Sequence, residues 1–274
     1  MSKKIKCKVC EKEYDINYDE CPKCHTKNEE QPRDFKHNTV LHFGKQIALF
    51  ITGWLGFQLI ALLIEIVMIR TNNITTNQAL NEFFSKNVNN MILNAAAYGV
   101  LLLILLIIIN IDIKKLAKSF AQWKGYIAAL IGLGVIFAFN IIYNSILNAA
   151  GVRITSNNNQ QALDTNNATF PITSLLIFGI VGPICEELTY RVGLFSLSKR
   201  ISKWVAYPVT IVVFALIHFD FQASNMVNEW INIPYYAVAA FTLSFVYDKY
   251  GFSSSCVLHI ANNIISLTLI RCIQ

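Results

Sequence analysis

Charged side chains are scarce in this sequence. Asp, Glu, Lys and Arg make up 15% of the 274 residues, whereas hydrophobic residues make up 54%, and the mean hydropathy is +0.43. An average soluble domain is about 25% charged and less apolar than this chain. The composition therefore argues against a soluble globular protein. It predicts an all-α membrane protein that crosses the bilayer several times.

Apolar runs long enough to cross a hydrocarbon core, about 20 residues each, occur seven times. They cover residues 45–69, 91–112, 126–149, 171–197, 204–223, 232–248 and 253–272. We therefore expect about seven transmembrane helices, although the last four runs are less clearly bounded than the first three. They divide into an N-terminal group, residues 45–149, and a C-terminal helical core, residues 170–272.

The distribution of basic residues predicts the orientation in the membrane. Nineteen of the 23 Lys and Arg residues fall in the N-terminal segment and in the second, fourth and sixth predicted loops. The other side holds Arg70, Lys86, Arg153 and Arg271. Cytoplasmic loops of membrane proteins carry such an excess, so we expect a multi-pass plasma-membrane protein with a cytoplasmic N-terminus. Its net charge of +6 follows from this topology and requires no nucleic-acid partner.

Four cysteines fall within the first 28 residues in two C-x2-C pairs that are ten residues apart. They are Cys7, Cys10, Cys21 and Cys24. Two such pairs can present four thiolates to one tetrahedral zinc ion, and a reducing cytoplasm disfavours disulfides. We expect a small zinc ribbon over residues 1–28, which folds with its metal, and then a linker over residues 29–44. His25 could replace one thiolate, and a metal-free tail is the alternative.

Ionisable and polar residues inside the predicted spans form three sets. They are Glu186, Glu187 and Arg191 in the fourth span, Phe214 and His218 in the fifth, and His259 and Asn263 in the seventh. A charged group at bilayer depth costs about 2.5 to 3.5 kcal/mol on insertion scales, so such groups persist mostly where they pair or take part in function.

Helical spacing separates the two glutamates. Glu187 lies four residues before Arg191, the favourable order for an ion pair on one helix face. Glu186 is rotated by about 100° from Glu187, so it remains free to act. His259 and Asn263 are also four residues apart, and one helix stripe can therefore present two hydrogen-bond donors to a single oxygen.

The order E-E-x-x-x-R, F-x-x-x-H and H-x-x-x-N over residues 170–272 resembles the CPBP family of intramembrane endopeptidases. That family includes the CAAX prenyl proteases and the bacteriocin-processing and self-immunity Abi proteins. The resemblance implies that residues 170–272 are a catalytic helical core that hydrolyses peptide bonds within the membrane. The implied substrates are membrane-associated peptides or proteins, either lipidated or leader-bearing precursors.

The resemblance also implies a role for each motif residue. Glu186 would be the general base that activates a water molecule, and His218 would orient that water. His259 and Asn263 would stabilise the oxyanion of the tetrahedral intermediate. Support for the site would come from Glu187, Arg191 and Phe214. A carboxylate in a desolvated cavity suits a base, and two preorganised donors suit an oxyanion.

Two questions remain open in the sequence. H-E-x-x-H, the spacing that holds zinc from one helix, does not occur, and Asn263 suits an oxyanion donor better than a metal ligand. We therefore favour a metal-free active site, with catalytic zinc as the alternative. The chain could instead be a catalytically silent scaffold or immunity protein that binds partners through the ribbon. A transporter is less favoured, because no inverted repeat is evident.

Overall fold

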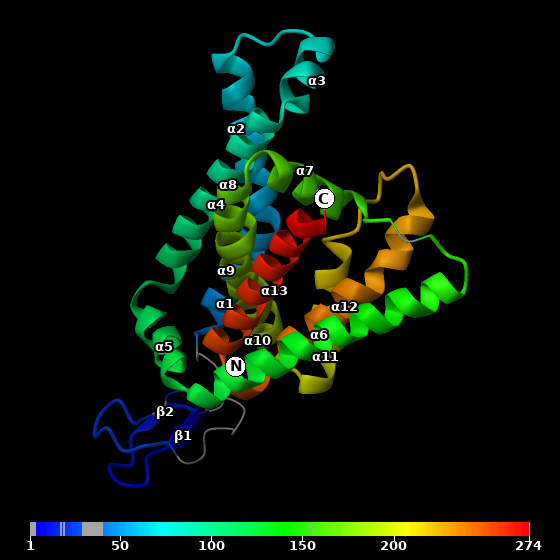
Figure 1. Cartoon of the computed structure of the whole chain (residues 1–274). Coiled ribbons are helices and arrows are strands. Elements are labelled where there is room, and N and C mark those ends of the chain that lie inside the picture. The colour runs from blue at the N-terminus through cyan, green and yellow to red at the C-terminus, as the bar shows by residue number, and fades with distance from the viewer. Residues whose placement is uncertain (1–3, 17, 19, 29–40, 154, 274) are drawn as a thin grey trace.

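Helices dominate the computed structural model, which describes residues 4–16, 18, 20–28, 41–153 and 155–273. They form one bundle with a small β unit at one end (Figure 1). The elements are β1 (Lys4–Lys6), β2 (Glu13–Asp15), α1 (Phe43–Ile51), η2 (Thr52–Gly56), α2 (Phe57–Thr71), α3 (Asn77–Ser85), α4 (Asn87–Ile109), η3 (Asn110–Asp112), α5 (Ile113–Lys118), η4 (Ser119–Ala121), α6 (Trp123–Ala149), α7 (Asn158–Thr169), α8 (Pro171–Leu176), η5 (Ile177–Val181), α9 (Gly182–Glu186), η6 (Glu187–Phe195), α10 (Ser196–Lys199), α11 (Lys203–Leu216), α12 (Met226–Tyr250) and α13 (Phe252–Ile273). Of the predicted linker, residues 29–40 lie outside the described part, and α1 already begins at Phe43.

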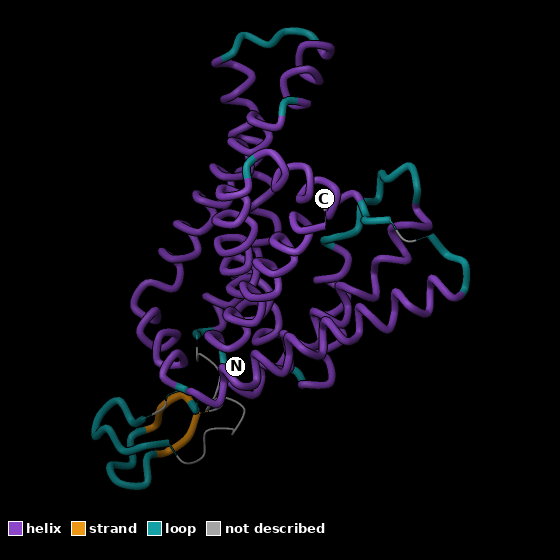
Figure 2. Tube along the Cα trace, viewed as in Figure 1, coloured by secondary structure: helices purple, strands orange, loops and turns teal. Residues whose placement is uncertain are grey.

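The β unit is a short antiparallel hairpin, coloured orange in Figure 2. Ile5 of β1 pairs with Tyr14 of β2, and their side chains pack with Cys7 and Cys21 into a small core. So few apolar side chains bury too little surface to stabilise a fold on their own. The hairpin therefore needs a further source of stability, such as a metal ion.

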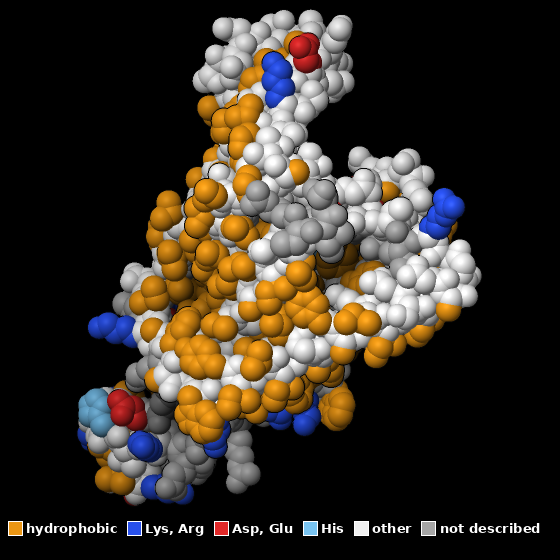
Figure 3. All heavy atoms as spheres, viewed as in Figure 1, with side chains coloured by type: hydrophobic (Ala, Val, Ile, Leu, Met, Phe, Trp, Pro, Cys, Tyr) orange, Lys and Arg blue, Asp and Glu red, His pale blue; other side chains and the backbone are white. Residues whose placement is uncertain are grey.

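Within the described residues, five helices are long and apolar enough to cross a membrane. They span Phe43–Thr71, Asn87–Ile109, Trp123–Ala149, Pro171–Lys199 and Phe252–Leu269. Each coincides with one of the seven predicted runs, which confirms the all-α membrane class. Exposed apolar side chains such as Leu63, Ile107 and Leu130 belong to a broad hydrophobic surface across the bundle (Figure 3), as expected where helices face lipid.

The other two predicted spans are not confirmed. Helix α11 has 14 residues, which gives a length of about 21 Å at 1.5 Å per residue, less than the hydrocarbon core of about 30 Å. Helix α12 has 25 residues, but its first half carries the polar residues Asn228, Glu229 and Asn232. These three side chains are buried against protein, so the segment is amphipathic rather than uniformly apolar.

The continuous helix Pro171–Lys199 lies at the centre of the bundle. All nine residues of η6 are buried, and η5 and η6 are π-helical, a form that is often found at functional sites. Helix α1 and η2 approach this helix closely through two glycines. A Cβ atom on Gly53 would lie 1.7 Å from Thr189 Oγ1, and one on Gly193 would lie 2.9 Å from the Phe50 backbone nitrogen.

Candidate active site

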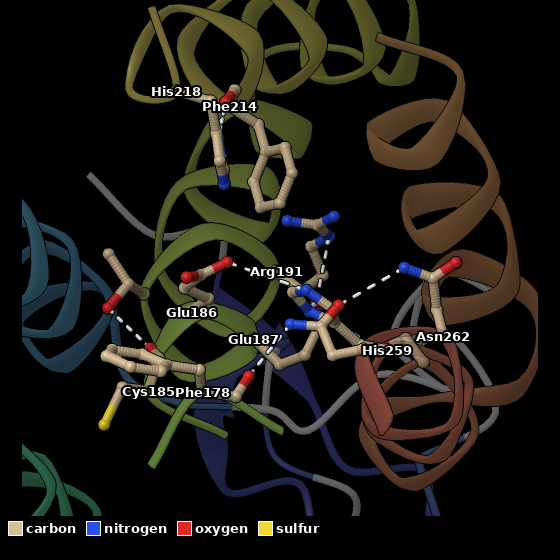
Figure 4. Close-up of polar contacts among 12 residues, drawn as sticks. Phe178, Cys185, Glu186, Glu187, Arg191, Phe214, His218, His259 and Asn262 are labelled. Atoms are coloured by element: carbon tan, nitrogen blue, oxygen red, sulfur yellow. Dashed lines mark hydrogen bonds and ion pairs between the residues drawn. The ribbon is translucent and has the colours of Figure 1, made fainter. Parts of the chain in front are cut away.

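The three polar motifs converge in the middle of the bundle (Figure 4). Glu186 ends α9 and Glu187 begins η6, whereas Phe214 lies near the end of α11 and His259 in α13. Glu187 has an exposed fraction of 0%, and Phe214 and His259 are also buried. Sequence positions about 30 and 70 residues apart thus meet at one place.

Glu187 is held by three side chains. Its Oε1 lies 2.9 Å from His259 Nδ1 and 3.6 Å from Arg191 Nε, while Ser255 Oγ donates a hydrogen bond of 2.6 Å to Oε2. The expected contact with Arg191 is present. Sequence reasoning missed Ser255, although it lies four residues before His259 on the same helix stripe, where an i,i+4 search would have found it.

Glu186 is much less constrained than Glu187. Its Oε2 lies 3.7 Å from His259 Nε2 and has no hydrogen-bond partner among the described residues. Its side chain is 20% exposed and lines a cavity. His259 therefore lies between two carboxylates, one saturated and one facing open space. This position differs from the simple stripe of two donors that the spacing of His259 and Asn263 predicts.

The Phe214 ring separates the two histidines. Its centroid lies 4.8 Å from that of His218 and 6.0 Å from that of His259. The guanidinium carbon of Arg191 lies 4.5 Å from the same ring centroid, within range of a cation–π interaction. Phe214 thus spaces the imidazoles and covers the buried cation.

The ring of His218 is fixed on two sides. Its Nδ1 lies 2.8 Å from the carbonyl oxygen of Phe214, and its face stacks on Tyr236 at 4.4 Å between centroids. A carbonyl can only accept, so Nδ1 donates and the neutral ring carries its lone pair on Nε2. Tyr236 is a second residue that sequence reasoning missed, because its position beside His218 depends on the packing of α12.

Asn263 is engaged in a backbone contact. Its Nδ2 donates to the carbonyl oxygen of Phe178 at 3.0 Å, and its Oδ1 accepts from Asn262 Nδ2 at 3.2 Å. Phe178 lies in the π-helical segment η5, where the backbone pattern departs from that of an α-helix. The predicted oxyanion donor therefore faces the cavity with its amide already bonded.

All four residues with a predicted catalytic role line the same cavity, of about 150 Å³. They are Glu186, His218, His259 and Asn263. The cavity walls also include Tyr98, Phe178 and Leu243, together with polar residues of α7 and α13. The arrangement combines an accessible carboxylate, two imidazoles and apolar walls, which suits proton transfer to and from a bound water.

The four N-terminal cysteines form a separate cluster. Their Sγ atoms all lie within 4.8 Å of one another, and two pairs are 3.4 Å apart. Zinc–sulfur bonds of about 2.3 Å in a tetrahedron place sulfurs about 3.8 Å apart, so the cluster fits one zinc ion. Hydrogen bonds from Thr26 lower the pKa of Cys24 to about 6. His25 lies outside this group and contacts Glu20 at 3.1 Å.

Comparisons with known proteins agree with the motifs. Residues 168–265 match the family of type II CAAX prenyl endopeptidase Rce1-like proteins. The chain is 24% identical over 154 residues to UPF0177 protein YvdC of Lactococcus lactis, a match that covers 54% of this chain and 55% of the relative. The alignment thus spans about half the length of that protein. No solved structure matches. These matches support the resemblance to the CPBP family that the three motifs carry, over residues 168–265.

Proposed function

We propose that this chain is an intramembrane endopeptidase in which Glu186 activates a water molecule for attack on a peptide carbonyl. One observation carries the proposal: Glu186 faces the cavity without a hydrogen-bond partner among the described residues, while the adjacent Glu187 is saturated by three contacts. Two neighbouring carboxylates in such different environments suit different tasks. Glu187 organises the site, and Glu186 exchanges protons.

Glu186 takes a proton from water, the water oxygen bonds to the carbonyl carbon, and a tetrahedral oxyanion forms. The carbon–nitrogen bond then breaks as the proton passes to the leaving amine. His218 accepts a hydrogen bond from the attacking water through Nε2, because Nδ1 is engaged by Phe214.

His259 and Asn263 are proposed to stabilise the oxyanion. His259 contacts Glu187 at Nδ1 and presents Nε2 beside Glu186, so the proposed role requires Nε2 to carry the proton that it donates to the oxyanion. Asn263 must exchange its bond to Phe178 for the oxyanion, a rearrangement that substrate binding would drive. Arg191 and Phe214 keep Glu187 and the imidazoles in place.

We propose that the reaction needs no catalytic metal. In the part of the chain that the structure describes, the one group of three or more His, Cys, Asp and Glu side chains close enough to share an ion is the cysteine cluster. The Phe214 ring lies between His218 and His259, and Nδ1 of His259 is used by Glu187. Zinc is therefore proposed for the ribbon, with a structural role.

The family supports peptide substrates in a lipid environment. Lipidated peptides and leader-bearing precursors are the two classes that we propose. The alternative is a silent scaffold that recruits partners through the ribbon. The two functions differ in their dependence on Glu186, because a scaffold tolerates its neutralisation.

Cleavage of a pool of membrane-associated peptides by the purified full chain in nanodiscs tests the proposal. Wild type is compared with Glu186→Gln, and with Glu65→Gln, which neutralises a carboxylate in α2 that does not line the cavity. We expect wild-type activity that is lost in Glu186→Gln and kept in Glu65→Gln. We also expect the wild-type activity to persist in the presence of a chelator. Wild-type activity unchanged in Glu186→Gln would overturn the proposed base. A catalytic metal would be established if the chelator removed activity and zinc restored it, and if the same result were obtained in Cys7→Ser, in which the ribbon site is disrupted.

A further inference from the structure

The candidate active site is closed toward one end of the bundle. That end, called here the basic end, is where α1 begins and where Lys45, Lys199 and Lys203 lie; Figure 3 shows the basic side chains near it in blue. The opposite end, called the α7 end, carries α7 and the last turns of α13 (Figure 1).

Toward the basic end, side chains on η6, α12 and α13 are fully buried. Val192, Phe195 and Tyr247 have exposed fractions of 0%, as do Ser255 and Leu258 on the turn of α13 before His259. The hydroxyl of Tyr247 lies 2.7 Å from Ser196 Oγ, which ties α12 to the helix end. This layer of described residues offers no route for a peptide.

Toward the α7 end, the cavity continues past the motif residues. Its lining includes Asn262 and Ser266 of α13 and Asn159 and Gln160 of α7. Ser266 is seven residues beyond His259, a rise of about 10 Å along the helix. A hollow is visible on the surface beside α13 and below α7 (Figure 3). The open direction of the cavity is therefore the α7 end.

The chemistry of the lining selects a class of ligand. Amide and hydroxyl groups near α7 can donate to and accept from peptide groups, while Leu163, Phe178 and Leu267 supply apolar walls. Among the described lining residues there is no Lys or Arg. A carboxyl terminus would thus meet the Glu186 carboxylate with no lining Lys or Arg to pair with it, which disfavours it. An internal, uncharged peptide segment fits this lining.

We propose that substrates enter from the α7 end, as an uncharged internal segment of a peptide presented on that face of the membrane. The inference rests on the proposed function and specifies its substrate. With the predicted orientation, the α7 end faces outside the cell. Of the two proposed substrate classes, this entry route selects leader-bearing precursors cleaved within an exported segment over lipidated C-termini in the cytoplasm.

Sidedness of cleavage tests the proposal. A membrane-impermeant fluorogenic peptide that the detergent-solubilised full chain cleaves is added to right-side-out spheroplasts and to inside-out vesicles. We expect cleavage by the spheroplasts and, in the vesicles, cleavage only after detergent is added. Cleavage by intact inside-out vesicles, without cleavage by spheroplasts, would overturn the entry route. The entry route would also be overturned if the enzyme cleaved the peptide in detergent but in neither sealed preparation.

A labelling experiment separates this inference from the proposed function, because it needs no activity. Ser266→Cys, with Cys185, Cys256 and Cys272 changed to Ser, is treated with an impermeant maleimide and mapped by peptide mass. The expected result is labelling of residue 266 in spheroplasts and of the four ribbon cysteines, at the other end, in inside-out vesicles treated with a zinc chelator. Labelling of residue 266 together with the ribbon from one side would contradict the inference.

Blocking the cavity gives a further readout. Ser266→Trp fills the proposed entrance, whereas Thr268→Trp places the same bulk on an exposed position of α13 outside the cavity. We expect the first variant to lose at least about tenfold in kcat/KM and the second to retain activity, with both folded by thermal melting. Equal activities would overturn the entrance.

Discussion

His259 contacts Glu187 through Nδ1 at 2.9 Å, and the same ring places Nε2 3.7 Å from Glu186. One imidazole thus lies between two adjacent carboxylates and makes them unequal. Glu187 is enclosed by His259, Ser255 and Arg191, while Glu186 is the carboxylate next to open space. The proposed division between an organising glutamate and a reacting glutamate depends on this geometry.

Neutralising Glu187 should destabilise the protein more than neutralising Glu186. Glu187→Gln leaves the guanidinium of Arg191 buried without its anionic partner, and an uncompensated buried charge costs about 3 to 5 kcal/mol. We expect a lower midpoint of thermal unfolding in detergent for Glu187→Gln and a small change for Glu186→Gln. The double variant Glu187→Gln, Arg191→Met should regain stability but not activity. Equal stability of the two single variants would contradict the assignment.

A buried carboxylate on α12 anchors the segment around His218. Glu229 accepts hydrogen bonds from the backbone nitrogens of Asn158 at 2.9 Å and Asp220 at 3.0 Å. Asn157 in turn donates to the carbonyl oxygen of His218 at 2.8 Å and accepts from the hydroxyl of Tyr236 at 3.0 Å. These contacts fix the orientation of the His218 ring from the α7 side.

Loosening this anchor should therefore slow catalysis without preventing binding. In Tyr236→Phe the ring still stacks on His218 but the bond to Asn157 is lost, whereas Tyr236→Leu removes both. We expect kcat to fall modestly in the first variant and by about tenfold or more in the second, with KM nearly constant. Steady-state kinetics on one peptide substrate measures the difference. Identical kcat values for Phe, Leu and Tyr would remove the positioning role.

The same segment should respond to acid through Asp220. The side-chain amide of Asn158 and the backbone nitrogen of Gln222 lower the pKa of Asp220. Because the pKa of Asp220 is lowered by folding, its ionised carboxylate stabilises the folded segment at pH values above its unfolded pKa of about 3.9. This stabilisation is lost as the pH falls through the pKa of the folded state. Protease nicking at residues 151–157 should increase below that pH in wild type. Asp220→Asn should be nicked equally across the range.

Close packing of η2 against η6 should depend on Gly53. Its Cβ would meet Thr189 Oγ1 at 1.7 Å, whereas a Cβ on Gly99 of α4 would meet no atom within 4 Å. We expect Gly53→Ala to destabilise the protein by about 1 to 3 kcal/mol and Gly99→Ala to be neutral or slightly stabilising. Melting curves of the two variants under one detergent condition compare them directly. A Gly53→Ala melt that coincides with wild type would show that the helices are not so closely packed.

Zinc should hold the ribbon and leave the bundle intact. Removing the metal with a chelator, or changing Cys10 to Ser, should expose Ile5 and Tyr14, because their core is small and folding of such units is coupled to metal binding. We expect one zinc per chain in wild type and less in Cys10→Ser, with an unchanged melting point of the helices. A bundle that melts earlier without zinc would show that the ribbon supports it.

Local spacing was sufficient to predict parts of the site. The contact of Glu187 with Arg191 is an i,i+4 relation within one segment, and the four cysteines follow from their spacing. The spacing of the motifs could not show that the Phe214 ring lies next to both His218 and His259. That arrangement requires the short α11, which ends before His218.

The sequence by itself determined the solvent and the helical class of the chain. Long apolar runs must form helices in lipid, because no water is present there to satisfy the backbone. Only the tertiary structure decided that His259 lies between the two glutamates, which carbonyl Asn263 bonds and where the cavity leads. Those features depend on the π-helical segments and on helix crossing, which change the direction of a side chain by amounts that a fixed 100° per residue cannot describe.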